Sequence, residues 1–304
     1  MRTAPRHVRG GDVEDESKQI RKWLSTEGYP LEYECAHVLA SHGFQVSHGE
    51  YYLDEQAQKL REMDVRGQLN RIATRLPQVI VTLMLIVECK ATSKPWVVLD
   101  SLDPGTPWWA VGATSVMRGA EINTVLALYE AKHDEASWLF ELPAHYGYSA
   151  IEGFRKGSAT DPAYSALQSV GDATLAWSGM YLPGGPSVWL TVPVIVLGSH
   201  LYSLRYEEDR TEVLERCPWK RVLFRGFAPA EPISVDIVER GSFGDYVSRA
   251  KASALDLFPV MVAARRAGTE GEDATDPSQD EPGDEPLVEG IPFLFRPERP
   301  YPKG

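Results

Sequence analysis

The sequence has few cysteines, no long apolar run and no excess of positive charge. Cys35, Cys89 and Cys217 are the 3 cysteines in 304 residues, too few and too scattered for a disulfide framework, which favours a reduced, cytoplasmic setting. They show no ligand spacing with the 7 histidines, which argues against a structural zinc site. No run of about 18 apolar residues is present, so neither a membrane-spanning helix nor a membrane partner is expected. The basic N-terminal segment has no apolar stretch typical of a secretory signal.

The negative charge is unevenly distributed. The net charge of −12 argues at first against a nucleic-acid partner. Nine acidic residues, uninterrupted by lysine or arginine, lie within 267–290, and without them the rest of the chain has a net charge of only −3. The body could therefore carry a local basic face, although its affinity for DNA without further help should be modest.

Alternating helical and strand patterns predict an α/β fold with a mixed sheet. Leu31, Cys35, Val38 and Leu39 recur at three- and four-residue steps, which predicts a helix that ends at Gly43. A loop rich in proline and tryptophan is expected at 93–109. The other predicted helices are 119–132, 162–177 and 246–257, and the predicted strands are 44–52, 60–65, 78–90, 189–197, 200–206, 222–224 and 233–238. We expect the strand 200–206 to lie beside the strand 189–197 after a tight turn.

The strand 78–90 ends in an acid and a base. Its residues 81–87 read VTLMLIV, as expected for a strand covered on both faces. Alternate residues of a strand point the same way, so Glu88 and Lys90 should share one face while Cys89 occupies the other. Asp64 lies 24 residues before Glu88, and a hairpin-like connection over 66–78 would place the two strands side by side.

Asp64 and Glu88 are therefore candidate metal ligands. Two carboxylates this close repel each other unless a cation lies between them. Hard divalent cations such as Mg²⁺ favour an oxygen-rich, partly hydrated site. Strand ends also open onto crevices in α/β sheets, which makes the end of strand 78–90 a natural place for a site.

Asp64 followed by Glu88-Cys89-Lys90 at the end of an apolar strand resembles the PD-(D/E)xK nuclease superfamily, which has the restriction-endonuclease-like fold. Met63 stands where the motif's name puts proline. The resemblance covers 29–100 well and extends more loosely to 197–206.

The predicted first helix adds to the resemblance. The segment LEYECAHVLASHGFQV is similar to the first helix of type IV restriction enzymes, which carries a glutamate near its start and a glycine–aromatic pair at its end. By its spacing to Gly43, Glu32 matches that glutamate, and Glu34 is the close second choice. Gln168 is a further candidate, since related nucleases often place a polar site residue on a later helix.

The resemblance implies a role for each matching residue. Asp64 and Glu88 would bind Mg²⁺, with Mn²⁺ as the alternative ion, assisted by the backbone carbonyl of Cys89. Lys90 would position or activate the attacking water and stabilise the charge that builds on the phosphate. Glu32 or Glu34 would hold a metal-bound water or a second ion. Metal ions make hydroxide available near neutral pH and offset charge in phosphoryl chemistry.

The expected domain is restriction-endonuclease-like over 29–260, with a mixed β-sheet flanked by helices and an inserted helical segment at about 110–180. Residues 1–28 are expected to form a flexible arm with one short helix near 20–24. The segment 261–304 is acidic and contains proline, so a disordered tail is expected there.

The implied function is a magnesium-dependent nuclease that hydrolyses phosphodiester bonds, with DNA as the expected substrate, in restriction or defence against foreign DNA. The alternative is a catalytically inactive nuclease-like subunit that binds or scaffolds a larger complex. A protein partner or a homodimer is left open. Simpler interpretations exist for the site: a solvated strand end for Glu88 and Lys90, a turn cap for Asp64, and helix surface for Glu32 and Glu34.

Overall fold

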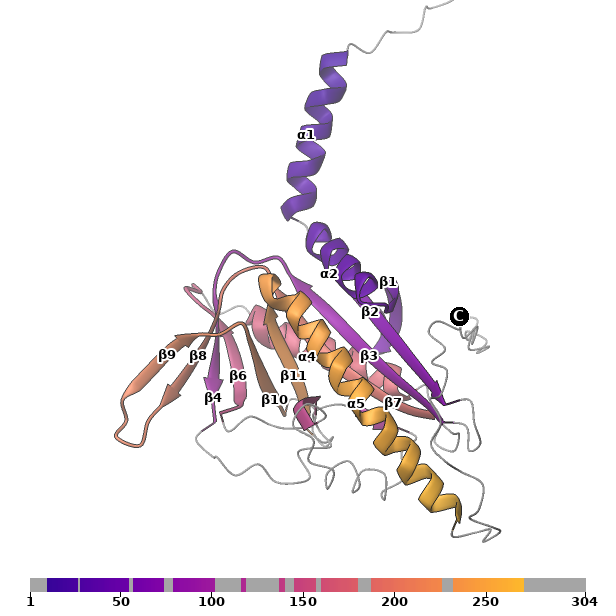
Figure 1. Ribbon diagram of the computed structural model, residues 1–304. Coiled ribbons are helices and arrows are strands. Elements are labelled where there is room, and N and C mark those ends of the chain that lie inside the picture. The colour runs from indigo at the N-terminus through magenta and orange to yellow at the C-terminus, as the bar shows by residue number, and fades with distance from the viewer. Residues whose placement is uncertain are drawn as a thin grey trace, which may run out of the picture.

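The computed structural model describes residues 10–26, 28–54, 57–73, 79–101, 116–118, 137–139, 145–156, 160–179, 187–225 and 232–270. In these residues the chain is mixed α/β, as predicted, with parallel and antiparallel pairs combined in one 11-stranded sheet. Helices cover both faces of that sheet (Figure 1).

The strands in the described residues are β1 (Gln45–Asp54), β2 (Lys59–Ala73), β3 (Val79–Lys90), β4 (Trp96–Asp100), β5 (Val116–Arg118), β6 (Gly147–Glu152), β7 (Ser187–Leu197), β8 (Leu201–Tyr206), β9 (Glu212–Arg216), β10 (Trp219–Phe224) and β11 (Ile233–Glu239). The helices are α1 (Gly10–Thr26), α2 (Tyr29–Ser41), α4 (Pro162–Gly179) and α5 (Phe243–Glu270), and two short 3-10 turns are η2 (Ser137–Leu139) and η3 (Arg240–Ser242).

The sheet runs in the order β1-β2-β3-β7-β11-β10-β6-β4-β8-β9, and β5 pairs with β7. Strands β1, β2 and β3 form an antiparallel meander, whereas β3 and β7 run parallel from Ile80–Ser187 to Lys90–Leu197. The two most apolar strands therefore lie side by side at the centre, where both of their faces are covered.

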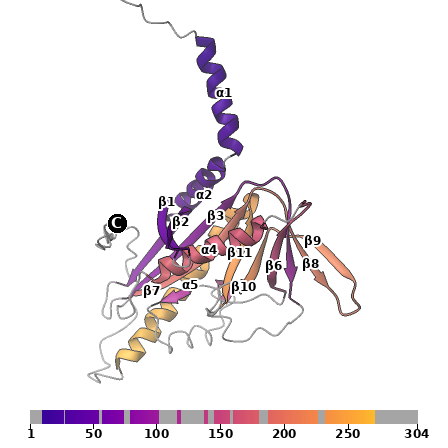
Figure 2. The same cartoon turned by 180° about the vertical axis from the view of Figure 1, so that it is seen from behind.

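Two separate core clusters lie on the two faces of the sheet. On one face α2 and α5 pack through Leu39 and Val247 against residues that include Leu85. On the other face α4 packs through Leu167 against residues that include Met84. Figure 2, seen from behind, shows α4 lying across the face opposite α5. Successive residues of β3 thus enter different clusters, as expected for a strand with period two.

Strand β2 is longer than the sequence predicts. The prediction placed a strand over 60–65 and a connection over 66–78, but β2 continues to Ala73 and pairs with β3 as far as Val79. Polar residues in this part of the strand gave no strand pattern, because the side chains that pair with them belong to other elements. Arg66 pairs with Glu50 at 2.7 Å and lies over the Trp177 ring at 4.4 Å.

The predicted loop at 93–109 contains strand β4, in which Trp96, Val98 and Asp100 are buried. The sequence analysis also missed the short strands β5, β6 and β9, of which β5 and β6 lie within the segment 110–180 that was expected to be helical. Strand β8 lies where predicted in sequence but not in space, because it pairs with β4 and β9 and not with β7. The segments that follow β3 and β7 stay side by side: the N–H of Gly198 donates to the Lys90 carbonyl at 2.9 Å, and the N–H of Trp96 donates to the His200 carbonyl at 2.9 Å.

The ends of the chain also differ from expectation. Helix α1 spans Gly10–Thr26, longer than the short helix expected near 20–24, and it projects from the body (Figure 1). Helix α5 continues through Pro259 to Glu270, past the predicted end at 257 and the predicted domain boundary at 260. The helix expected at 119–132 and the tail beyond Glu270 fall outside the described residues. No helix of the described chain has the length and apolar content to cross a bilayer.

Candidate active site

Strands β2 and β3 separate where the predicted site residues begin. The last registered pair is Val65 opposite Val87. Beyond it, the backbone N–H of Cys89 donates to Oδ2 of Asp64 at 2.7 Å. The carboxylate of Asp64 thus accepts the hydrogen bond that a carbonyl of the neighbouring strand would otherwise accept, and it is held at the end of β3.

A change of face in β2 places Asp64 there. Val65 lies in the core cluster under α2 and α5, whereas Met63 lies in the cluster under α4. Residues two apart on a regular strand share a face, so β2 must rotate at Asp64. The neighbouring strand distorts at the same level: Gly49 has a φ of 57°, in the left-handed region that favours glycine.

Glu88 and Lys90 lie on the face of the sheet that α4 covers. Oε1 of Glu88 is 2.5 Å from Nζ of Lys90, and Oε2 accepts a hydrogen bond of 3.2 Å from Oγ of Ser169. Glu88 is only 8% exposed, so both of its oxygens need these partners. Cys89 points to the opposite face, where its Sγ is 3.7 Å from Sγ of Cys35.

Ser169 is a site residue that the sequence reasoning missed. The candidate expected on this helix is its neighbour Gln168, but the hydroxyl that reaches Glu88 is that of Ser169. The buried residues Ala166 and Val170 define the face of α4 toward the sheet, and at 100° per residue Ser169 lies closer to that face than Gln168 does. Helical periodicity could therefore have identified it. The hydroxyl of Tyr52 donates to the Ser169 carbonyl at 3.2 Å and joins β1 to this point.

The two acids of α2 have different surroundings. Nε of Arg240 donates to Oε1 of Glu34 at 2.9 Å, so Glu34 is engaged on the side of η3. Glu32 is in the electrostatic reach of the site: burial first, and then the charges of Glu62 and Glu88, raise its pKa above the ordinary value. Of the two acids left open by the sequence, Glu32 is the one whose pKa responds to the charge of Glu88.

The charges at the site are poorly balanced in the protein alone. Burial, followed by the charge of Glu88, raises the pKa of Asp64 from 3.8 to about 7, although the bond from Cys89 N–H opposes the rise. Burial disfavours the charged form of Lys90, but the charge and hydrogen bond of Glu88 together with the charge of Asp64 act against it, and the pKa of Lys90 is raised above 10.5. The ammonium therefore stays charged at neutral pH, and a second cation beside Asp64 would lower the electrostatic cost further.

The described residues contain no group of three or more His, Cys, Asp or Glu side chains in a metal-holding arrangement. The set expected here is smaller, because it consists of two carboxylates and one backbone carbonyl. Asp64 fits this set, because it keeps one oxygen beyond its bond to Cys89. A divalent cation would also offset the charge of Glu88, which after burial is the second cause of the raised pKa of Asp64. Glu88 fits less well, because Lys90 and Ser169 contact both of its oxygens.

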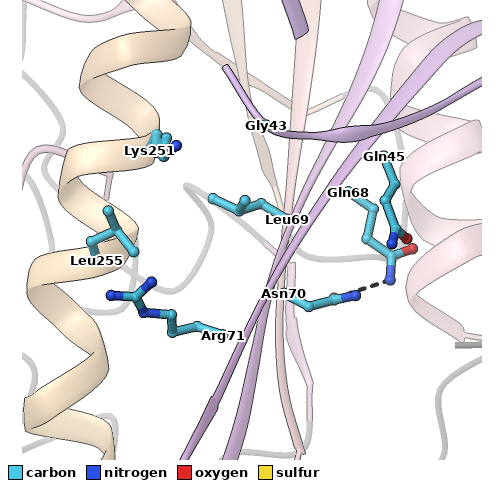
Figure 3. Close-up of a pocket in the computed structure, with 8 residues that line it drawn as sticks. All are labelled: Gly43, Gln45, Gln68, Leu69, Asn70, Arg71, Lys251 and Leu255. Carbon is cyan, nitrogen blue, oxygen red and sulfur yellow. Dashed lines mark hydrogen bonds between the residues drawn. The ribbon is translucent and has the colours of Figure 1, made fainter. Parts of the chain in front are cut away.

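Two residues that follow the motif make contacts within the protein. Lys94 is ion-paired to Glu152 at 3.0 Å, and Trp96 is fully buried in the core. A hollow in the surface lies elsewhere, between α5 and the other end of β2 (Figure 3). It is lined by residues that include Arg71 and Lys251 but by no predicted site residue.

No protein-family model, curated protein or solved structure matches the chain. What the site does must therefore be argued from the residues that β2, β3, α2 and α4 bring to the end of β3.

Proposed function

We propose that the protein is a magnesium-dependent nuclease of PD-(D/E)xK type that hydrolyses phosphodiester bonds in DNA. The observation that carries the proposal is the position of Asp64, which leaves the β2 ladder and accepts the Cys89 N–H beside the Glu88–Lys90 pair. A solvated strand end gives no reason for a half-buried acid to be held there. The restriction-endonuclease-like fold is part of the same proposal, as are a role in restriction or defence and a cytoplasmic location.

Asp64, Glu88 and the carbonyl of Cys89 would hold Mg²⁺. The bound ion would supply a nucleophilic hydroxide near neutral pH and offset negative charge on the phosphate. Lys90, whose ammonium stays protonated, would orient the attacking water and contact a phosphate oxygen. Ser169 would fix the Glu88 carboxylate, and Glu32 would hold a water at the α2 side of the site.

The proposal is tested by incubating plasmid DNA and single-stranded DNA with the full chain, with and without Mg²⁺. Asp64→Asn is the matched variant, because the amide can still accept the Cys89 N–H while the charge is lost. We expect cleavage that needs Mg²⁺ and disappears in Asp64→Asn. Cleavage that persists at the wild-type rate in this variant would show that the activity arises elsewhere.

One observation favours a second candidate function, a nuclease-like binding or scaffold subunit without catalysis. Lys90 and Ser169 occupy both oxygens of Glu88, so a metal ligand there would have to give up part of its present bonding. Isothermal titration with Mg²⁺ and with Mn²⁺ separates the candidates. If the protein is a nuclease, the wild type should bind the metal ion and Asp64→Asn should not. If it is a scaffold, neither protein needs to bind the ion.

A further inference from the structure

A short turn next to the site exposes an aromatic ring. Phe154 follows β6 and is 83% exposed, the highest value among the large apolar side chains of the described residues. Its φ is 56°, in the left-handed region that bulky side chains rarely adopt. Glycine or asparagine would relieve the strain at such a position. The ring is thus presented to solvent from a backbone that is unfavourable for it.

The other described non-glycine residues with positive φ are Gln58 and Arg210. Both are polar and lie in hairpin turns, between β1 and β2 and between β8 and β9, so ordinary turn geometry accounts for them. An exposed phenylalanine has no such explanation, since its ring gains no burial. Strained backbone that persists under these conditions is concentrated at binding sites.

The turn is held rigidly against the loop that follows the motif strand. The N–H of Gly153 donates to the Pro95 carbonyl at 2.7 Å, and a Cβ at Gly153 would meet that oxygen at 3.0 Å. On the other side, Arg155 pairs with Asp161 at 3.3 Å, just before α4. Phe154 is therefore clamped between two anchored neighbours and is a preorganised contact.

The ring also lies within reach of the candidate active site. Thr92, two residues after Lys90, donates to Glu152 at 3.0 Å, and Glu152 precedes Phe154 by two residues. With about 3.8 Å between consecutive Cα atoms, these steps place the Cα atom of Phe154 within about 25 Å of the Cα atom of Lys90. One nucleic-acid strand spans that distance with roughly seven nucleotides. Figures 1 and 2 show the end of β3 and the end of β6 at the same end of the sheet.

The charge around the turn is weakly positive, because Lys94 and Arg155 are each paired with an acid and Lys156 adds one further cation. Lys156 is exposed, and Lys94 is 46% exposed although it is paired with Glu152. Because the chain without its acidic segment has a net charge of only −3, phosphate contacts alone would bind nucleic acid weakly. Stacking of bases on aromatic rings adds affinity that does not depend on sequence.

We infer that Phe154 is a stacking platform for an unpaired base of the nucleic-acid strand on which the Asp64–Glu88–Lys90 site acts. The inference rests on the proposed function and names its substrate class, a strand with at least one unpaired base near the scissile bond. A base in an intact duplex is stacked on its neighbours and cannot lie on this ring.

The experiment measures binding of the full chain, in metal-free buffer, to fluorescent oligonucleotides of one sequence as single-stranded DNA, single-stranded RNA and duplex DNA. Phe154→Ala should weaken single-strand binding about tenfold or more, and Phe154→Trp should restore it. The matched control is Tyr206→Ala, which removes a half-exposed aromatic ring on the β8–β9 hairpin. A 2-aminopurine in the strand should be quenched by the wild type and not by Phe154→Ala.

The outcomes separate the inference from the proposed function. Single-strand binding by Phe154→Ala within twofold of the wild type would overturn the stacking role while leaving Mg²⁺-dependent cleavage to stand on its own assay. An equal loss on duplex DNA would overturn the assignment to an unpaired base. A wild-type chain that neither binds nor cleaves any of the three nucleic acids would overturn both proposals.

Discussion

Asp64 and Cys89 are joined across two strands by a hydrogen bond of 2.7 Å from backbone N–H to carboxylate. The bond forms because the pairing of β2 with β3 begins only at Val65, so that the side chain of Asp64, the residue before it, takes the position of a backbone acceptor. It fixes the acid next to the Glu88–Lys90 pair, and it is the reason why the variants below should change chemistry more than fold.

Lys90→Ala should reduce cleavage by at least about 100-fold, because the ammonium is the cation that the protein itself supplies to the phosphate. The fold should persist, since Lys90 is the last residue of β3 and its side chain is 31% exposed. The control is Lys251→Ala on α5, which removes a lysine bonded to the His42 carbonyl at 2.9 Å. Cleavage kinetics and circular dichroism of the two variants provide the comparison, and similar rates for both would contradict the role of Lys90.

Asp64→Asn should stabilise the protein in metal-free buffer, and the gain should grow with pH. The folded pKa of Asp64, about 7, lies above its ordinary value of 3.8. Protonated Asp64 therefore favours folding below pH 3.8, and this contribution is lost as pH rises through 7. Asparagine does not titrate, so the variant does not lose this contribution as the pH rises. Its unfolding free energy should exceed that of the wild type by about zero at pH 4 and by an amount on the order of 2 kcal/mol at pH 8.

Urea unfolding of wild type and Asp64→Asn at several pH values measures this gain. Glu88→Gln is the contrasting variant: it leaves Lys90 without its 2.5 Å ion-pair partner, so it should not stabilise to the same degree. Added Mg²⁺ should stabilise the wild type and not Asp64→Asn, since only a charged Asp64 would bind it. A gain that is constant with pH would mean that Asp64 does not titrate in this range.

Ser169→Ala should lower kcat by about tenfold without a large change in KM, because Ser169 positions the Glu88 carboxylate through its 3.2 Å bond and does not touch the substrate. Ser169→Thr keeps the hydroxyl and should recover part of the rate. Gln168→Ala, one residue away on α4, is the control and should cleave like the wild type. Equal kinetics for Ser169→Ala and the wild type would remove Ser169 from the site.

Glu32→Gln should change the rate of cleavage, whereas Glu34→Gln should change only the stability of the protein. The charge of Glu88 contributes to the raised pKa of Glu32, so neutralising Glu32 should slow cleavage and shift the pH profile. Glu34 pairs with half-exposed Arg240, and loss of such a pair costs about 0–1 kcal/mol with no effect on rate. The pH dependence of kcat/KM and thermal unfolding of both variants test the division, and slower cleavage by Glu34→Gln would reverse it.

Local pattern was sufficient for the central elements of the fold. The apolar run that ends at Glu88 predicted β3 to within one residue, and three- and four-residue spacing predicted α2, because burial on a regular element imposes a period that a reader can count. The same run predicted two faces at its end, one with Glu88 and Lys90 and one with Cys89. These features depend on residues a few positions apart.

Contacts between distant segments decided the rest. The rotation of β2 between Met63 and Val65, which places Asp64 at the site, departs from the period that sequence reasoning assumes. Ser169 meets Glu88 only because α4 lies across β3, and Glu32 is distinguished from Glu34 only because Arg240 lies beside the latter. The last two outcomes are set by partners that lie 81 and 206 positions away in the chain, and no local spacing encodes such a distance.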